Sequence, residues 1–425
     1  MVGRIRGCGA VTEDWVETVA TLAYQSFPTP PLDAPRAFAS WLSTIGPEPE
    51  GPRNREGPVW QSPRSRNAAP LSMGPMSWPV PPFVSVAELA DAWDEPVDAL
   101  RWLADRPAIG RTRVMPPDWN YRYRWVPKRA GGWRLIEAPR PRLAQVQRRL
   151  LHDVLDRIAN HPCAYGFVSG RSVADFAAPH VGRGLVIRID LEDFFPSVGA
   201  SRVYGIFRAA GYPEPIAHLF TAIATTRTPR TVHSQVPPSS RDPQVVDRHR
   251  RSRQRLADAH LPQGAPTSPS LANLAAFRLD QRLAGLAARV DARYSRYADD
   301  LVFSWPADVS RRINVDRWAA SVARIAVDEQ FQVNETKTRA MRPWQRQEVG
   351  GIVVNERLRV SRRQVDRVRA MVHCAATGGV SSLRGVPPGI DPTAHLLGFI
   401  SWIEFVNPSD GTRLRADFAR IDQAR

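Results

Sequence analysis

Two adjacent aspartates, Asp299 and Asp300, lie between two runs of residues that predict β-strands. The flanking runs, Tyr294–Tyr297 and Leu301–Trp305, are rich in aromatic and branched side chains, which are typical of strands. Because adjacent residues of a strand point to opposite faces, a purely structural hairpin rarely carries carboxylates on both. The stretch YSRYADDLVFSW therefore predicts a hairpin whose tip performs a chemical task.

A third carboxylate ends another predicted strand, far upstream. In GLVIRIDLEDFFPSV the β-prone run Leu185–Ile189 leads directly to Asp190. Three carboxylates brought together would repel one another unless a cation lies between them. Magnesium prefers carboxylate oxygens, and two such ions can activate a hydroxyl and stabilise a leaving pyrophosphate. A turn that merely favours aspartate explains one carboxylate of the pair, whereas a site for two Mg²⁺ ions (or Mn²⁺) explains Asp190, Asp299 and Asp300 together.

The charge balance favours a polyanionic partner. The 425 residues include 58 Lys and Arg against 42 Asp and Glu, a formal net charge of +16. Such an excess suggests nucleic acid first and a membrane surface second. The apolar run HLLGFISWIEFV is too short to span a bilayer. Three scattered cysteines, Cys8, Cys163 and Cys374, argue against a disulfide framework or a zinc site and suit a soluble protein of the cytoplasm.

Composition shifts predict the organisation of the chain. The first 45 residues suggest two short helices, and the Pro-, Gly- and Ser-rich residues 46–82 predict a disordered or extended linker. From about Tyr121 to Asn355, short strands alternate with helices, as in α+β or α/β proteins. An Arg-rich segment at about 228–258 lacks apolar periodicity and predicts a disordered surface insertion, whose charge either contacts phosphates or is simply solvated.

Residues 356–425 predict a small basic helical domain. One helix begins after Ser361 and stops at Gly378–Gly379, with an apolar stripe of Val365, Val368 and Val372. A second helix covers TAHLLGFISWIEFVN. The outer face of the first helix carries four arginines, Arg362, Arg363, Arg367 and Arg369.

Several stretches resemble the motifs of reverse transcriptases. YADD is similar to their Tyr-x-Asp-Asp signature, and RIDLEDFFPSV resembles their first palm strand. LPQGAPTSPSLANL is similar to the Gln-Gly-x-x-x-Ser-Pro segment, and NETKT resembles the palm lysine segment. VGGIVVN resembles the hairpin before the thumb, and KRAGGWRLIEAP with RPRLAQVQRRLL resembles the fingers. One such motif is weak, whereas six in the correct order are a strong signal.

The resemblance covers about Tyr121 to Arg425 and implies an α+β right-hand polymerase with fingers, palm and thumb. The palm is expected to carry an antiparallel sheet. The predicted boundaries are an N-terminal helical extension (1–45), a linker (46–82), N-terminal helices and fingers (83–180), the palm (181–355) and a helical basic thumb (356–425).

The resemblance also implies residues that bind the deoxynucleoside triphosphate. Lys128 and Arg134, on a predicted Gly-turn hairpin, suit the gripping of a triphosphate. Gln263 belongs to a segment that opens a helix beneath the templating base, and Lys337 is a candidate proton donor to pyrophosphate. Phe195 matches the aromatic steric gate that excludes a 2′-hydroxyl, which favours DNA synthesis.

Within the family, the region before the first palm strand is similar to that of bacterial retron enzymes. FAAPH resembles their Asn-Ala-x-x-His signature, with Phe176 in place of the asparagine and His180 retained. Their Val-Thr-Gly signature appears as Val349–Gly350–Gly351. The resemblance implies a cognate structured non-coding RNA, priming from the 2′-hydroxyl of an internal guanosine, and a branched RNA–DNA product. It also implies antiphage defence together with an effector, and RNA binding by the four thumb arginines.

Three alternatives remain open at this point. One is a group II intron-like or other phage-defence reverse transcriptase. Another is a polymerase-like scaffold that binds RNA without catalysis, which the intact aspartates disfavour. The third is an RNA-dependent RNA polymerase, which Phe195 disfavours because its ring cannot accept a ribose hydroxyl.

Overall fold

A computed structural model describes residues 72–104, 120–128, 132–236, 243–380, 383–387 and 389–423. The helical extension predicted for residues 1–45, and the predicted linker as far as residue 71, lie outside these described residues. Within the described ranges, no helix combines the length and the apolar character that a membrane crossing requires.

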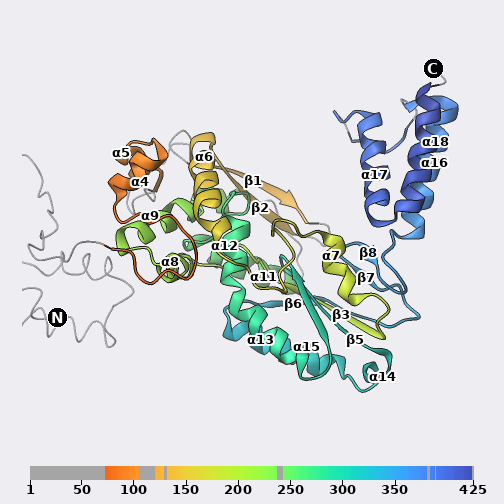
Figure 1. The fold of residues 1–425 in the computed structure, drawn as a ribbon, viewed down its shortest axis with the longest axis horizontal. Coiled ribbons are helices and arrows are strands. Elements are labelled where there is room, and N and C mark those ends of the chain that lie inside the picture. Colours follow the sequence, from red (N-terminus) through yellow and green to blue (C-terminus); the bar gives the residue numbers. More distant parts are fainter. Residues whose placement is uncertain are drawn as a thin grey trace, which may run out of the picture. The chain divides into compact units, whose positions relative to one another are not determined.

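Helices and short strands alternate along the described chain (Figure 1). The elements before the central sheet are α4 (Val86–Trp93), α5 (Val97–Ala104), β1 (Tyr121–Pro127), β2 (Trp133–Pro139), α6 (Pro141–Arg149), η2 (Leu150–Val154), η3 (Leu155–Arg157), α7 (Val173–Ala177) and η4 (Ala178–His180). Strands β1 and β2 form an antiparallel hairpin, as the Gly-containing turn predicts. Ser85 caps α4 by accepting a hydrogen bond from the amide of Glu88.

A four-stranded antiparallel sheet forms the centre of the fold, with the strand order β4-β5-β3-β6. Its strands are β3 (Leu185–Leu191), β4 (Arg293–Tyr297), β5 (Asp300–Trp305) and β6 (Val333–Met341). The helices between them are α8 (Ala200–Ala209), α9 (Glu214–Ala224), α10 (Arg230–His233), α11 (Pro243–Ala257), α12 (Ser268–Ala275), α13 (Phe277–Ala288), α14 (Ala307–Ser310) and α15 (Val315–Asp328). The predicted hairpin is confirmed, and the register places Asp190 directly opposite Asp300.

The sheet buries apolar side chains on both faces because strand residues alternate. Leu185, Ile187 and Ile189 of β3 belong to a large core that includes residues of α8, α9, α12, α13 and α15. Val186 points to the opposite face and belongs to a second core with Phe176 of α7. Arg188 and Asp190 follow Val186 at intervals of two, so they lie on that second face of β3.

The C-terminal region is a helical bundle, as predicted. After the short hairpin of β7 (Glu348–Val349) and β8 (Ile352–Val353), the helices are α16 (Arg362–Gly378), α17 (Pro392–Val406) and α18 (Pro408–Gln423). Val365, Val368 and Val372 are buried in the second core, so the predicted apolar stripe is confirmed. The sequence did not predict α18, which packs against both α16 and α17.

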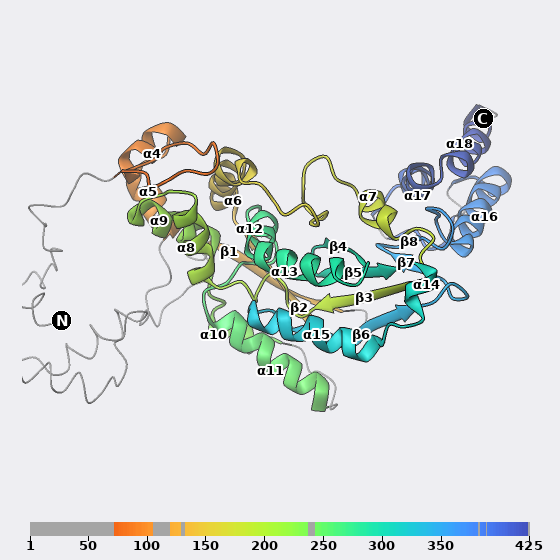
Figure 2. The same ribbon diagram turned by 60° about the horizontal axis from the view of Figure 1, so that its bottom comes forward.

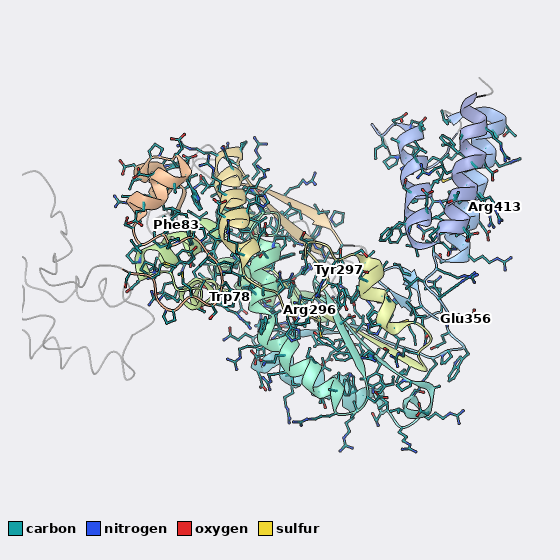
Figure 3. The ribbon with its side chains drawn as sticks, viewed as in Figure 1. Trp78, Phe83, Arg296, Tyr297, Glu356 and Arg413 are labelled. Atoms are coloured by element: carbon teal, nitrogen blue, oxygen red, sulfur yellow. The ribbon has the colours of Figure 1, made fainter. Side chains whose placement is uncertain are left out.

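The prediction of disorder for the segment 228–258 is wrong for the residues that the structure describes. Within the segment 228–258, α11 is a helix of 15 residues, drawn as one continuous coil in Figure 2. Its arginines pair with acidic side chains elsewhere in the fold, which is why an apolar stripe was not needed. The end of the predicted linker, residues 72–82, has no helix or strand. It is nevertheless packed, because Val80 is buried and Trp78, like Phe83 just beyond the linker, packs against the large core (Figure 3).

Candidate active site

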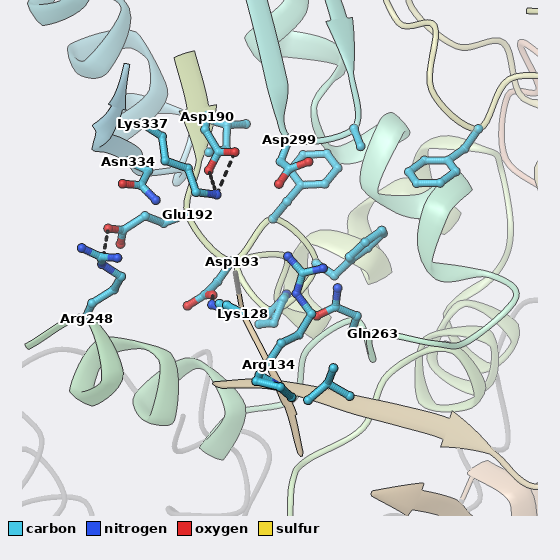
Figure 4. A pocket seen from close by; sticks show the side chains of 18 residues that line it. Lys128, Arg134, Asp190, Glu192, Asp193, Arg248, Gln263, Asp299, Asn334 and Lys337 are labelled. Carbon is cyan, nitrogen blue, oxygen red and sulfur yellow. Dashed lines mark hydrogen bonds and ion pairs between the residues drawn. The ribbon is translucent and has the colours of Figure 1, made fainter. Parts of the chain in front are cut away.

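A pocket of about 640 Å³ opens where β3 ends and the β4–β5 turn begins. Asp190 and Asp299 line it on one side, facing Lys128, Arg134 and Gln263 on the other (Figure 4). Asp190 belongs to β3 and Asp299 to the β4–β5 turn, and the two segments are joined where the amide of Leu191 donates to the carbonyl oxygen of Asp299 at 2.8 Å. Residues that are distant in the sequence therefore surround one polar cavity.

Asp190 is held by a cation. Lys337 of β6 places its Nζ 3.0 Å and 2.8 Å from the two carboxylate oxygens of Asp190. The Asp190 side chain is 12% exposed and that of Lys337 is 44% exposed. The lysine thus neutralises the aspartate at the pocket wall while remaining accessible itself.

Asp300 is held by a different cation. Because Asp300 lies opposite Asp190 in the register, it shares the face of the sheet that carries Arg188. Arg188 Nε donates to Asp300 Oδ1 at 2.6 Å. The structure therefore brings Asp300 beside the other two aspartates, but it directs this carboxylate to Arg188 rather than into the pocket lining.

Burial and mutual repulsion act on the acidic groups of the hairpin. Burial raises the pKa of Asp299, and the nearby negative charge of Asp190 raises it further. Burial also raises the pKa of Asp300 to about 6, although Arg188 opposes that change. Both shifts reflect the cost of placing several carboxylates in one poorly solvated place.

The resemblance to reverse transcriptases implies divalent metal ions at this site. Within the described part of the chain, no three His, Cys, Asp or Glu side chains are grouped closely enough to hold a metal ion. Asp190 and Asp299 nevertheless offer carboxylate oxygens to one pocket, which is the ligand type that Mg²⁺ prefers. Lys337 and Arg188 supply the positive charge that balances Asp190 and Asp300 in this structure. The residues fit such an ion chemically, with two carboxylates facing the cavity.

The residues predicted to bind the nucleotide all line this pocket. They are Lys128, Arg134, Phe195, Gln263 and Lys337. Lys128 pairs with Asp193 at 3.4 Å. Gly264 follows Gln263 with φ +135°, and a Cβ there would lie 3.0 Å from the carbonyl oxygen of Glu137, so the close approach requires glycine.

Two adjacent phenylalanines have different environments. Phe194 is 4% exposed and stacks on Phe331 in the core. Phe195 is half-buried and lines the pocket, with its ring centroid 6.1 Å from that of Phe167. Phe167 has φ +60°, an uncommon conformation for an aromatic residue, and it also contacts Tyr297.

A buried ion pair supports the β4–β5 turn from behind. Arg296, which precedes Tyr297 at the end of β4 (Figure 3), donates to both carboxylate oxygens of Asp280 at 2.8 Å and 2.7 Å. Both side chains are fully buried. Arg296 Nη1 also donates to the carbonyl oxygen of Ala298 at 3.1 Å. The residue before Asp299 is therefore fixed by a charged network that the sequence analysis missed.

The four arginines predicted to belong to the thumb lie on α16, away from the apolar stripe. Arg362, Arg363, Arg367 and Arg369 are all exposed. Arg362 and Arg369 each pair with Asp366 on the same helix. The predicted charged face is therefore present.

A family model for reverse transcriptase (RNA-dependent DNA polymerase) matches residues 126–375, which is more than half of the chain. The chain belongs to the reverse transcriptases. The match includes the pocket, the central sheet and most of α16, so the predicted family is confirmed.

Individual relatives narrow the assignment to retron enzymes. This reverse transcriptase is 41% identical to the retron Mx65 reverse transcriptase of Myxococcus xanthus over 297 residues, covering 68% of this chain and 62% of the relative. It is 33% identical to the retron Mx162 reverse transcriptase of the same organism over 352 residues, covering 80% and 67%. It is 28% identical to the retron Ec86 reverse transcriptase of Escherichia coli over 316 residues, covering 74% and 85%. The chain thus spans less than two thirds of the Mx65 relative.

The two departures from the retron signatures are neighbours in this reverse transcriptase. Gly350 has φ +57°, and a Cβ there would lie 2.5 Å from Val173 and 3.3 Å from the Phe176 ring. Compared with the retron signatures, this chain therefore has a larger side chain at position 176 and a smaller residue at position 350, next to it in space. His180, the retained member of the first signature, is buried and bridges the hydroxyls of Ser304 and Ser295 at 2.7 Å and 2.6 Å. Burial lowers the pKa of His180 to about 3, so it is a neutral structural group.

Sequence reasoning missed several residues that line the pocket of this enzyme or hold its aspartates. Arg188 could have been found from its position two residues before Asp190, because a cation inside an apolar strand needs a partner on its own face. Phe167 gave no local signal of its backbone conformation. The acidic pair Glu192 and Asp193, and Arg248 of α11, also line the cavity and were not predicted to do so.

Proposed function

We propose that this chain is an RNA-directed DNA polymerase that copies its own structured non-coding RNA into a branched RNA–DNA product. The observation that carries the proposal is the pocket in which Asp190 and Asp299 face Lys128 and Arg134. Its polarity fits a polyanionic substrate that reacts between carboxylates and cations. The similarity to retron enzymes supports the RNA template and the branched product. We extend the proposal to a cytoplasmic role in antiphage defence with an effector.

Primer extension tests the catalytic part of the proposal. The purified full chain, with Mg²⁺, deoxynucleoside triphosphates and a DNA primer on an RNA template, should extend the primer. A chain that binds the primer–template but does not extend the primer with any divalent metal would instead be a non-catalytic scaffold. Incorporation of ribonucleotides with equal efficiency would favour an RNA polymerase.

Divalent metal use follows from the family, and we propose Mg²⁺ as the metal, two ions per site, with Mn²⁺ as a substitute. Asp190 and Asp299 would hold the metal in the pocket, with Asp300 as the third carboxylate at the same strand ends. When bound, such ions activate the attacking hydroxyl and stabilise the charge on the leaving pyrophosphate. Lys337 would exchange its contact with Asp190 for one with the pyrophosphate and donate a proton to it.

The nucleotide is proposed to lie between the β1–β2 hairpin and the palm. Lys128 and Arg134 would bind its phosphates by charge-assisted hydrogen bonds. Gln263 would contact the base pair from the segment that leads into α12. Each of these side chains already borders the cavity, which supports the assignment without any rearrangement of the backbone.

Phe195→Ala should relax the choice of sugar. Because the ring of Phe195 borders the pocket, its removal opens room for a 2′-hydroxyl, and the preference for deoxynucleotides over ribonucleotides should fall by roughly 100-fold. The measurement is kcat/KM for both nucleotide types on one template. Phe277→Ala, which removes a partly exposed ring outside the pocket lining, should leave the ratio unchanged. An unaltered preference in Phe195→Ala would remove the gate from the proposal.

The thumb arginines are proposed to bind the cognate RNA. Contacts there should be directed to phosphates and to helix shape, because duplex RNA hides its base edges in a narrow groove. Reversing the charge of Arg362, Arg363, Arg367 and Arg369 should lower the amount of co-purifying RNA at least about tenfold.

A control with equal charge change is available on the palm. Arg311, Arg312, Arg317 and Arg324 are also four exposed arginines. Their reversal should leave most of the RNA bound. Equal losses from the two quadruple variants would mean that net charge, rather than the thumb surface, retains the RNA.

A further inference from the structure

Helix α11 brings a row of arginines to the edge of the pocket. Arg248, Arg251 and Arg255 lie on one side of the helix because they are three and four residues apart. Arg248 and Arg251 pair with Glu192, and Arg255 pairs with Asp193. These two acidic residues follow Asp190 closely in the chain, so the insertion borders the reaction site.

Arg248 is the least engaged of the three. Its Nε lies 4.0 Å from Glu192 Oε1, whereas Nη2 of Arg251 lies 3.3 Å from the same oxygen. Arg255 is bound at 3.3 Å to Asp193 and donates to Gln332 at 2.7 Å. Arg248 is 24% exposed and lines the pocket, where Figure 4 shows it beside Glu192. Its guanidinium is therefore the one with most freedom to take a new partner.

Backbone hydrogen bonds join the two ends of the insertion (about residues 228–258). Thr226 and His260, on either side of it, exchange backbone hydrogen bonds of 3.0 Å in both directions. Within the insertion, next to this pair, the amide of Thr228 donates to the carbonyl oxygen of Leu256 at 3.0 Å. Leu256 also packs with Val232 and with Leu135 of β2. The helix that carries Arg248 is thus anchored to the fingers hairpin.

A buried ion pair strengthens this anchor. The two ring nitrogens of His260 lie 2.7 Å from the carbonyl oxygen of Asp258 and 2.9 Å from Glu137 Oε2. A carbonyl oxygen and a carboxylate only accept, so the ring carries both protons and is a cation. Burial disfavours that charge, but Glu137 outweighs it and the pKa of His260 is raised. Glu137 belongs to β2, which also carries Arg134.

We propose that Arg248 of α11 is a further cationic contact, beside Lys128, Arg134 and Lys337, for a pyrophosphate group in the pocket. The inference rests on the proposed polymerase function, because that group is either the β,γ-phosphates of the incoming nucleotide or the pyrophosphate that leaves. Guanidinium presents parallel donors that match phosphate oxygens. Glu192 competes with the phosphate for Arg248 and Arg251, and so limits how tightly the group is held.

Direct titration of the full chain with inorganic pyrophosphate, at fixed Mg²⁺ and without template, tests the contact. Arg248→Ala should weaken pyrophosphate binding about tenfold, the loss expected for one charge-assisted hydrogen bond. Arg248→Lys, which keeps the charge, should recover part of the loss. Arg250→Ala is the matched control, because Arg250 is on the same helix, is 75% exposed and pairs only with Asp247 among the described residues.

Glu192→Gln should have the opposite effect. This substitution keeps the size of the side chain but removes the charge that holds Arg248 and Arg251. Pyrophosphate binding should therefore become several-fold tighter. Opposite signs from two neighbouring side chains would be hard to produce by a general loss of folding.

Steady-state kinetics separate the two sources of the pyrophosphate group. If Arg248 holds the incoming nucleotide, Arg248→Ala raises KM for the deoxynucleotide by the same factor. If Arg248 holds the leaving group, the inhibition constant of pyrophosphate rises while KM stays constant. Either pattern supports the contact.

Unchanged pyrophosphate binding in Arg248→Ala, or an equal loss in Arg250→Ala, would overturn the inference. Because this titration needs no primer or template, its failure is distinguishable from a failure of the proposed polymerase function. That function would fail instead if the unsubstituted chain extended no primer.

Discussion

Asp299→Asn is expected to reduce the rate of nucleotide incorporation by at least about 1000-fold, equivalent to several kcal/mol of lost charge stabilisation. The asparagine keeps the shape of the side chain and its place in the turn. It removes the negative charge that would hold a divalent cation opposite Asp190 in the pocket. Single-nucleotide primer extension in the pre-steady state measures the loss directly, and Asp190→Asn should behave in the same way.

The control for this substitution is Asp308→Asn, which changes an exposed carboxylate of α14. It should retain the rate of the unsubstituted chain, and both pocket variants should retain the melting temperature. More than a tenth of the original rate in Asp299→Asn would show that the reaction takes place elsewhere.

Asp280→Ala is expected to lower the free energy of unfolding by about 3–5 kcal/mol, because it leaves the buried Arg296 without its counter-charge. Tyr294 would also lose a hydrogen-bond partner, since its hydroxyl donates to Asp280 at 2.7 Å. Denaturant titration measures the change. Arg296 also holds the carbonyl oxygen of Ala298, so the surviving folded fraction should extend primers poorly.

An exposed pair of the same residue types provides the comparison. Arg282 and Asp328 pair at 2.7 Å, with side chains that are 38% and 49% exposed. Asp328→Ala should change stability only slightly, because solvent screens the charges that it separates. If Asp280→Ala were no more destabilising than Asp328→Ala, the buried pair would have no special role in supporting the turn.

Local patterns predicted the parts of the site that depend on local geometry. The run that ends at Asp190, and the hairpin around Asp299, follow from strand propensity and from alternation along a strand. The apolar stripe of α16 likewise follows from helical spacing. These features need no knowledge of which segments meet in space.

The features that the sequence did not predict depend on partners far along the chain. Asp300 turns to Arg188 because of the register between β3 and β5, which no local pattern specifies. Helix α11 lacks an apolar stripe and is instead held by ion pairs to Glu192 and Asp193. Composition alone therefore suggested disorder where tertiary charge pairing supplies the order.

The packing of residues 72–82, at the end of the predicted linker, also depends on partners far along the chain. A run rich in proline and glycine reads as a linker, yet Trp78 and Val80 within it bury apolar surface against the core. The composition of the run favoured the prediction of a linker more strongly than these two apolar side chains opposed it. Proline-rich segments can be ordered without regular secondary structure when their apolar residues have a surface to cover.

The most direct measurement is to sequence the nucleic acid that co-purifies with the chain when it is expressed with its flanking DNA. The account predicts one short DNA joined through a 2′ branch to a structured RNA, and the same RNA without DNA when Asp299→Asn replaces the parent. A linear product of mixed sequence, or identical DNA from parent and variant, would contradict it.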